Sequence, residues 1–164
     1  MTVATIGVYG WTAETFLAAL RAHELPAILD VRQRRGVRGR EYAWANAQRL
    51  QATLAEADIA YRHHKDLAPT TELRRLQYAE DESQGVGKRS RTVLATAYRE
   101  RYLREILDRV DLRPVLEELP AALLCVERDP EACHRSLIAE RLAAEPGVTM
   151  IDLLPPRNGS GRVA

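Results

Sequence analysis

The sequence predicts an α/β fold: a three-layer sandwich in which helices flank a mostly parallel central sheet of about five strands. Short, continuous apolar runs recur along the chain, which is typical of strands buried on both faces. Segments with helical spacing separate these runs. The first two runs, at 3–8 and 27–31, flank one helical segment, and this βαβ pattern implies a parallel pair with a right-handed crossover.

The N-terminal third begins with VATIGV at 3–8, a β-branched strand that Gly10 ends. Thr12 is placed to cap a helix over 13–23, with an apolar face formed by Phe16, Leu17 and Leu20. Pro26 ends the following turn, and AILDV at 27–31 forms the second strand.

The middle of the chain is less regular. Residues 32–45 are rich in Arg and Gly without a period, which predicts a loop, and Asn46 is placed to cap a helix that runs to about Ala57. IAYR at 59–62 is a short third strand, followed by His63 and His64. Residues 66–91 predict a loop with a weak helix near 71–80.

The C-terminal half predicts a strong helix over 92–109, with Val93, Ala97, Leu103, Ile106 and Leu107 facing inward. A brief helix near 113–118 precedes AALLCV at 121–126, the clearest buried strand. Asp129-Pro130 is expected to open a helix that Gly147 closes, and the last strand is 148–153. Residues 3–153 therefore form one domain, and we expect the tail 154–164 to be disordered.

Composition narrows the functional classes. Hydrophobic residues make up 46% and the formal net charge is +1, so the chain is globular and its global charge favours neither nucleic acid nor membrane. The sequence lacks a signal peptide and a run of about 20 apolar residues, so we expect a cytoplasmic protein. Two cysteines are too few for a secreted disulfide framework. The oligomeric state is not indicated.

Four segments carry a family pattern: Thr5-Ile6-Gly7, Asp30-Val31-Arg32, ADIAYRHHKDLAP, and the strand–loop–helix LLCVERDPEACHRSLIAERL. With these, the chain resembles the domain-of-unknown-function 488 family over about residues 3–153. The chain departs from the pattern at Ala68-Pro69, where the family usually has Gly-Gly, and in the polar residues that usually follow the first segment. Because the family is named for its unknown function, the resemblance implies a fold and a site but no reaction.

The polar residues of these segments fall at the carboxyl ends of predicted strands, where open parallel sheets bind ligands. We therefore expect one cleft there, lined by six residues. The catalytic candidates are Asp30, Glu127, Cys133 and His134, and the ligand- or anion-binding candidates are Arg32 and Arg135. The alternative is that these acids and arginines only pair with each other and fix loops.

Cys133-His134-Arg135 is predicted to lie at a helix N-terminus, a position that favours a thiolate and binds anions. Cys133 is then a nucleophile or a redox thiol, His134 a proton carrier and Arg135 an anion clamp or a partner of Glu127 and Asp30. The alternative for Cys133 is a structural role, in which it packs as a small apolar residue. Cys125, inside a core strand, is expected to be structural.

No cofactor is expected. A zinc site drawn from Cys133, His134, His63, His64 and Cys125 is the less favoured alternative. Adjacent residues such as Cys133 and His134 are expected to point in different directions, so one ion would rarely take both.

The sequence thus favours an enzyme with an anion-binding cleft that acts on a phosphate-bearing ligand such as a nucleotide or a nucleic-acid base. The alternative is a non-catalytic domain that binds nucleic acid or a partner through the loop 32–40, which holds five arginines and no acid.

Overall fold

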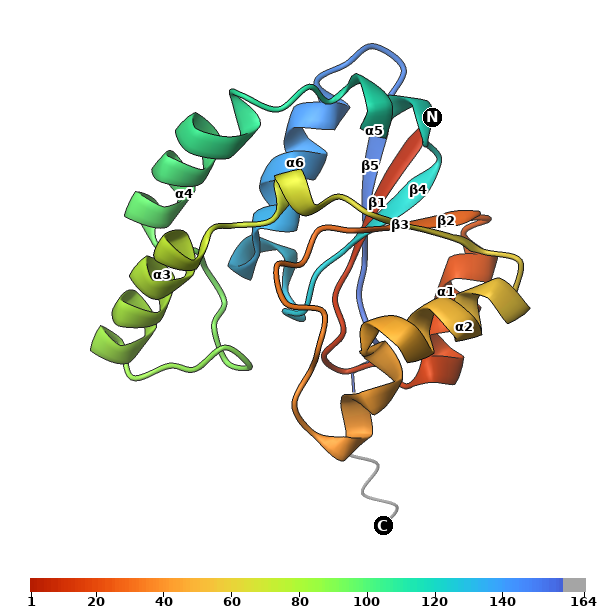
Figure 1. The fold of residues 1–164 in the computed structure, drawn as a ribbon, viewed down its shortest axis with the longest axis horizontal. Coiled ribbons are helices and arrows are strands. Elements are labelled where there is room, and N and C mark those ends of the chain that lie inside the picture. The colour runs from red at the N-terminus through yellow and green to blue at the C-terminus, as the bar shows by residue number, and fades with distance from the viewer. Residues whose placement is uncertain (158–164) are drawn as a thin grey trace.

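The computed structural model describes residues 1–157 and contains one parallel five-stranded sheet with the strand order β3-β2-β4-β1-β5 (Figure 1). The strands are β1 (Thr2–Ile6), β2 (Ala27–Asp30), β3 (Ala60–His63), β4 (Ala121–Leu124) and β5 (Thr149–Leu153). Every neighbouring pair is parallel, so the predicted α/β sandwich is confirmed.

Helices cover both faces of this sheet. Helices α1 (Ala13–Ala22) and α2 (Ala47–Glu56) lie on one face, and α6 (His134–Ala143) packs on the other, with α3 (Thr71–Ser83) and α4 (Thr96–Tyr102) on the same side (Figure 1). A short helix, α5 (Arg113–Glu117), precedes β4.

Alternate residues of each central strand belong to the two hydrophobic cores, one on each face of the sheet. In β4, Ala121 and Leu123 belong to the core cluster under α6, whereas Ala122 and Leu124 belong to the cluster under α1 and α2. All four are fully buried. A strand with two buried faces has to be apolar throughout, which explains why its signal in the sequence is a continuous run.

The two predicted caps differ. Thr12 caps α1, because its side chain accepts a hydrogen bond from the backbone N–H of Thr15 at 3.2 Å. Asn46 occupies the cap position of α2 but makes no capping bond. Its Oδ1 instead accepts from the backbone N–H of Val37 at 2.7 Å, which ties the Arg/Gly loop back to the helix. That loop also contains a 3₁₀ helix at Arg40–Ala45.

The strong helix expected over 92–109 begins later than predicted, and its expected inner face is confirmed at Ile106 and Leu107 but not in the first half of the range. Regular structure begins at Thr96 and passes into a π-helical turn, Leu103–Leu107. The preceding residues are held by tertiary bonds instead: the backbone N–H of Leu94 donates to the carbonyl of Glu131, and that of Ala95 donates to Oε1 of Gln77.

Tyrosines replace the expected aliphatic residues on the inner face of α4. Val93 is 67% exposed and Ala97 is also exposed, whereas Tyr98 and Tyr102 are buried. Both sets have helical spacing, and the tyrosines bury more apolar area. The weak helix expected near 71–80 extends to Ser83 as α3.

The helix expected at Asp129-Pro130 begins later. Pro130–Ala132 forms a single 3₁₀ turn, Cys133 is extended, and α6 begins at His134. The prediction that Cys133-His134-Arg135 lies at a helix N-terminus is therefore confirmed. The expected tail 154–164 falls largely outside the described residues. Within residues 1–157, none of the helices has the length and apolar character needed to cross a bilayer.

Candidate functional site

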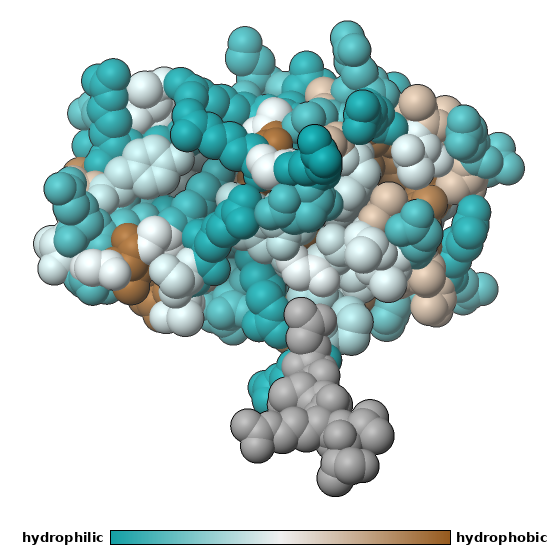
Figure 2. Space-filling view, turned by 90° about the horizontal axis from the view of Figure 1, so that it is seen from below, coloured by the Kyte–Doolittle hydropathy of each residue, from teal (hydrophilic) through white to brown (hydrophobic). Residues whose placement is uncertain are grey.

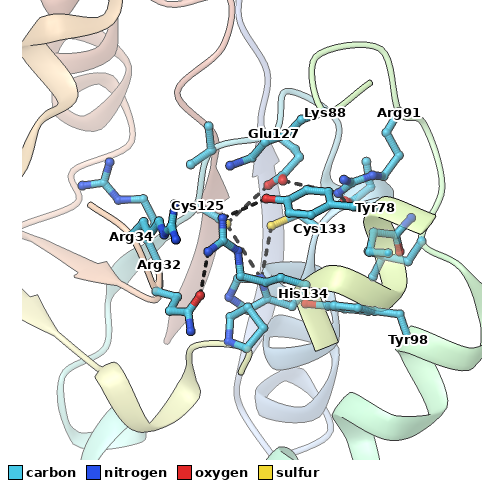
Figure 3. Close-up of a pocket in the computed structure, with 17 residues that line it drawn as sticks. Arg32, Arg34, Tyr78, Lys88, Arg91, Tyr98, Cys125, Glu127, Cys133 and His134 are labelled. Carbon is cyan, nitrogen blue, oxygen red and sulfur yellow. Dashed lines mark hydrogen bonds and ion pairs between the residues drawn. The ribbon is translucent and has the colours of Figure 1, made fainter. Parts of the chain in front are cut away.

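A small cavity of about 50 Å³, called the inner cavity below, lies at the carboxyl ends of β2 and β4 (Figure 3). Of the six residues that the sequence singles out, Arg32, Glu127, Cys133 and His134 line it. Asp30 and Arg135 do not line it; both are fully buried behind its wall. The strand ends thus bring four of the six candidates together.

Asp30 holds Arg32. The guanidinium of Arg32 donates from Nε to Oδ1 at 2.9 Å and from NH2 to Oδ2 at 2.8 Å. The phenol of Tyr61 donates to the second carboxylate oxygen, and Arg32 also donates from NH1 to the carbonyl of Ala45. With every carboxylate oxygen in use and the side chain fully buried, Asp30 orients Arg32 rather than facing a ligand.

Glu127 is anchored through its backbone and its side chain. A Cβ placed on Gly7 would lie 1.9 Å from the Glu127 carbonyl oxygen, so only glycine allows the chain just after β1 to pass so close. The carboxylate pairs with Arg91 at 3.4 Å, and Arg91 also donates to Asp81 of α3. This network fixes Glu127 at the wall of the inner cavity.

Arg135 supports the same loop from behind. Its NH1 donates to the carbonyl of Glu127 at 2.6 Å and its NH2 to that of Arg128 at 3.0 Å. Within residues 1–157 it makes no ion pair, and its buried Nε has no hydrogen-bond partner. The carboxylates of Asp30 and Glu127 are instead taken by Arg32 and Arg91, so Arg135 holds backbone rather than acids.

Two thiols and one imidazole meet in the wall of the inner cavity. His134 Nδ1 lies 3.8 Å from Cys125 Sγ and 3.7 Å from Cys133 Sγ. His134 Nε2 donates to the carbonyl of Val31 at 2.8 Å, which leaves Nδ1 without a proton in the neutral ring. In Figure 3 the imidazole lies below the two sulfurs and Glu127 lies above them.

Burial governs the ionisation of this group. It raises the pKa of Cys125 to about 12, with a further contribution from its hydrogen bond to Cys133. It also raises the pKa of Glu127, to which the Cys125 thiol donates at 3.4 Å. Burial alone would lower the pKa of His134, but Cys125 and the Val31 carbonyl raise it above its ordinary value.

The sequence did not single out several residues of the wall. Arg91 and Lys88 come from the basic segment 88–91, and Asp81 of the acidic stretch 80–82 pairs with Arg91. Cys125 faces the cavity although a core strand precedes it. The opposite charges of Asp81 and Arg91, ten residues apart, are the signal from which their ion pair could have been predicted. Tyr98, which also lines the cavity, carries no such signal.

A second, larger cavity of about 830 Å³, called the outer groove below, adjoins the first. Arg34, Arg74, Tyr78, Lys88 and Val126 line both. The outer groove adds Arg38, Arg75 and Arg89, and none of its lining residues within 1–157 is acidic. The molecular face seen from below in Figure 2 is predominantly hydrophilic.

The two histidines that follow β3 are engaged elsewhere. His63 Nε2 donates to the carbonyl of Arg32 at 3.0 Å, and His64 Nε2 lies 2.6 Å from Oε2 of Glu118. Neither residue lines the inner cavity.

Comparison with known proteins identifies the family. No curated protein and no solved structure shows a significant match to the chain. The profile of the family described as domain of unknown function DUF488 matches residues 12–142, a span that includes all six candidate residues. Since this match covers most of the sequence, the protein belongs to the DUF488 family.

Proposed function

We propose that the protein is an enzyme that binds a phosphate-bearing ligand, such as a nucleotide, in the outer groove and acts on it at the inner cavity. One observation carries this proposal. Arg34 and Lys88 line both cavities and, within residues 1–157, make neither an ion pair nor a side-chain hydrogen bond. Cations without partners at the junction of two cavities favour an anion that spans them.

The different sizes of the two cavities support separate roles, with ligand binding in the outer groove and reaction at the inner cavity. Pockets for small molecules usually measure about 300–1,000 Å³, a range that includes the outer groove of about 830 Å³. The inner cavity of about 50 Å³ admits only a small group. The bulk and the phosphate of a ligand therefore fit outside, with the reacting group inside.

The proposed catalytic groups are Cys133, His134 and Glu127. His134 presents an unprotonated Nδ1 toward the Cys133 thiol, so a proton passing from sulfur to nitrogen would leave a thiolate beside an imidazolium. Glu127 offers a second site for proton transfer on the opposite side of the sulfurs. Asp30 and Arg135 serve as positioning residues.

The proposal is tested by calorimetric titration of AMP and of inorganic phosphate. We expect the wild type to bind AMP and the double variant Arg34→Ala, Lys88→Ala to bind it at least about tenfold more weakly, since each change removes a charge-assisted contact. Arg113→Ala is the matched control, because Arg113 is 83% exposed and lies outside both cavities. Equal affinity in the double variant and the wild type would contradict the proposal.

The alternative, a non-catalytic nucleic-acid-binding domain, has one supporting observation. The guanidinium of Arg89 lies over the rings of Tyr9 and Tyr42, at 5.2 and 5.4 Å from their centroids, beside the outer groove. The loop 32–40 supports it less than the sequence suggests, because Arg32 is buried and Arg35 donates to Tyr61. A steep fall of oligonucleotide affinity with salt, unaffected by Cys133→Ser, would favour this alternative.

A further inference from the structure

We propose that Cys125, Cys133 and His134 form a binding site for a thiophilic divalent ion, zinc, whose open fourth position faces the inner cavity. The inference deepens the proposed function by naming a metal at the same site. It does not depend on the ligand of the outer groove.

The spacing of the three donor atoms carries the inference. The two sulfur-to-Nδ1 distances are 3.8 and 3.7 Å, and all three atoms lie within 4.8 Å of one another. A tetrahedral zinc with Zn–S of about 2.3 Å and Zn–N of about 2.0–2.1 Å separates such donors by about 3.6 Å. The residues therefore need little movement to close on an ion.

The orientation of His134 fits the same role. Its Nε2 donates to the carbonyl of Val31 at 2.8 Å, so the bare Nδ1 points at the sulfurs. A metal-bound histidine almost always donates its other ring N–H to a carbonyl, a carboxylate or water, which fixes the ring and its tautomer. The backbone of the loop after β2 supplies that partner here.

A change of backbone conformation lets two adjacent residues converge. Cys133 is extended, with φ −141° and ψ 145°, and His134 is the first residue of α6. The expectation that these neighbours point in different directions is therefore wrong. In a regular strand the two side chains would lie on opposite faces. At this junction both reach the same point.

The donor set and its surroundings select the ion. Two thiolates with one imidazole favour zinc over magnesium or calcium, which prefer oxygen ligands. Two thiolates also neutralise a divalent ion, so the occupied site adds no net charge beside Arg91 and Lys88. All three ligands are buried, and the cavity provides the opening for a fourth ligand such as water or a substrate oxygen.

An open position is typical of catalytic rather than structural zinc sites. A bound ion there would polarise the ligand or activate water, with Glu127 as the neighbouring carboxylate. With an ion bound, Cys133 and His134 would act as its ligands instead of as nucleophile and proton acceptor, and the ion would supply an electrophile.

The test measures metal content and cobalt spectra of the reduced wild-type protein. We expect about one equivalent of zinc, removable by a chelator, and a cobalt-substituted form that shows thiolate-to-cobalt charge transfer with tetrahedral d–d bands. Cys125→Ser and Cys133→Ser should each weaken zinc binding by about 100-fold or more. His23→Ala, which removes an exposed imidazole, should bind zinc like the wild type.

Several outcomes would overturn the inference. They are failure of the reduced protein to bind either ion, zinc binding that persists unchanged in both serine variants, and recovery of the two cysteines as a disulfide from freshly isolated protein. Circular dichroism of each serine variant shows whether it is folded, and zinc-dependent stabilisation of the wild type in thermal melts provides a measurement independent of the variants. AMP titration of Arg34→Ala, Lys88→Ala changes two cations and none of the three proposed zinc ligands, so failure of the proposed function is distinguishable from failure of the metal site.

Discussion

The two basic segments of the chain, 32–40 and 88–91, look alike in the sequence but are fixed by different means. Each sends one arginine inward: Arg32 is 1% exposed and Arg91 is 7% exposed. Each also contributes to the outer groove a cation, Arg34 or Lys88, that forms no ion pair with any of residues 1–157. The difference lies in what holds the buried arginine.

Arg32 is held by a carboxylate two residues before it, so the pair forms wherever β2 ends. Arg91 is held by Asp81, ten residues away in α3, and by Glu127, 36 residues away after β4. The first clamp is local, and the second joins three separate parts of the fold. The comparison shows that one side of the inner cavity is built into a strand end, whereas the other depends on tertiary packing.

The largest expected effect comes from breaking the local clamp. Asp30→Asn leaves the buried guanidinium of Arg32 without its counter-charge, which should lower the free energy of unfolding by about 3–5 kcal/mol in urea titrations. Asp111→Asn is a close control. Arg113 donates to Asp111 through the same backbone N–H, Nε and NH2 groups, but this pair is exposed. A similar loss in both variants would show that burial does not govern the clamp.

Removing the charge of Asp81, which pairs with Arg91, should destabilise the protein less than Asp30→Asn does. Arg91 keeps Glu127 as a second carboxylate partner in this variant. Asp81→Asn weakens charge-assisted bonds to Arg91, and we expect the free energy of unfolding to fall by about 1.5–3 kcal/mol. Hydrogen exchange should also become faster in residues 84–95, whose backbone is held by few regular bonds. Unchanged exchange in this segment would indicate that Arg91 does not hold it.

Arg135 offers a third case, since it is a buried arginine that pairs with no carboxylate among residues 1–157. Arg135→Lys cannot reach both carbonyls in the same fork, and we expect a loss of about 1–3 kcal/mol in thermal or urea unfolding. Phosphate should leave the difference between variant and wild type unchanged. A variant with wild-type stability that no longer responds to phosphate would instead make Arg135 an anion clamp.

The smallest expected effect on stability belongs to the cations without ion-pair partners. Arg34→Ala and Lys88→Ala should each change the free energy of unfolding by less than about 0.5 kcal/mol. Each should nevertheless weaken AMP binding several-fold in calorimetry. If either variant were strongly destabilised, its side chain would be part of the framework rather than of the groove.

The sequence predicted the five strands well because a parallel strand with two buried faces must be apolar throughout, and β4 shows this most clearly. The grouping of Arg32, Glu127, Cys133 and His134 followed from the rule that strand ends share one edge. Both predictions depend on short stretches of chain and on the topology alone.

What the sequence missed depends on distant contacts. The start of α4 is set by bonds from Gln77 and Glu131, which no local pattern reveals. Cys125 packs in the core as expected, but the turn of the chain after β4 that also brings its sulfur to His134 and the inner cavity is not visible in an apolar run. Tyr98 and Tyr102 have the same helical spacing as the expected aliphatic residues, and tertiary packing rather than spacing determines that they are buried in α4.

The strand order has a consequence for the order of synthesis. β4 lies between β1 and β2, although about 90 residues of chain separate it from β2. A nascent chain that has emerged only as far as α5 therefore lacks the strand that joins the two halves of the sheet. Until β4 emerges, the facing edges of β1 and β2 expose unpaired backbone groups, and such edges promote association with other chains. Cys125, Cys133 and His134 follow β4, so their cluster can form only after the sheet has been joined.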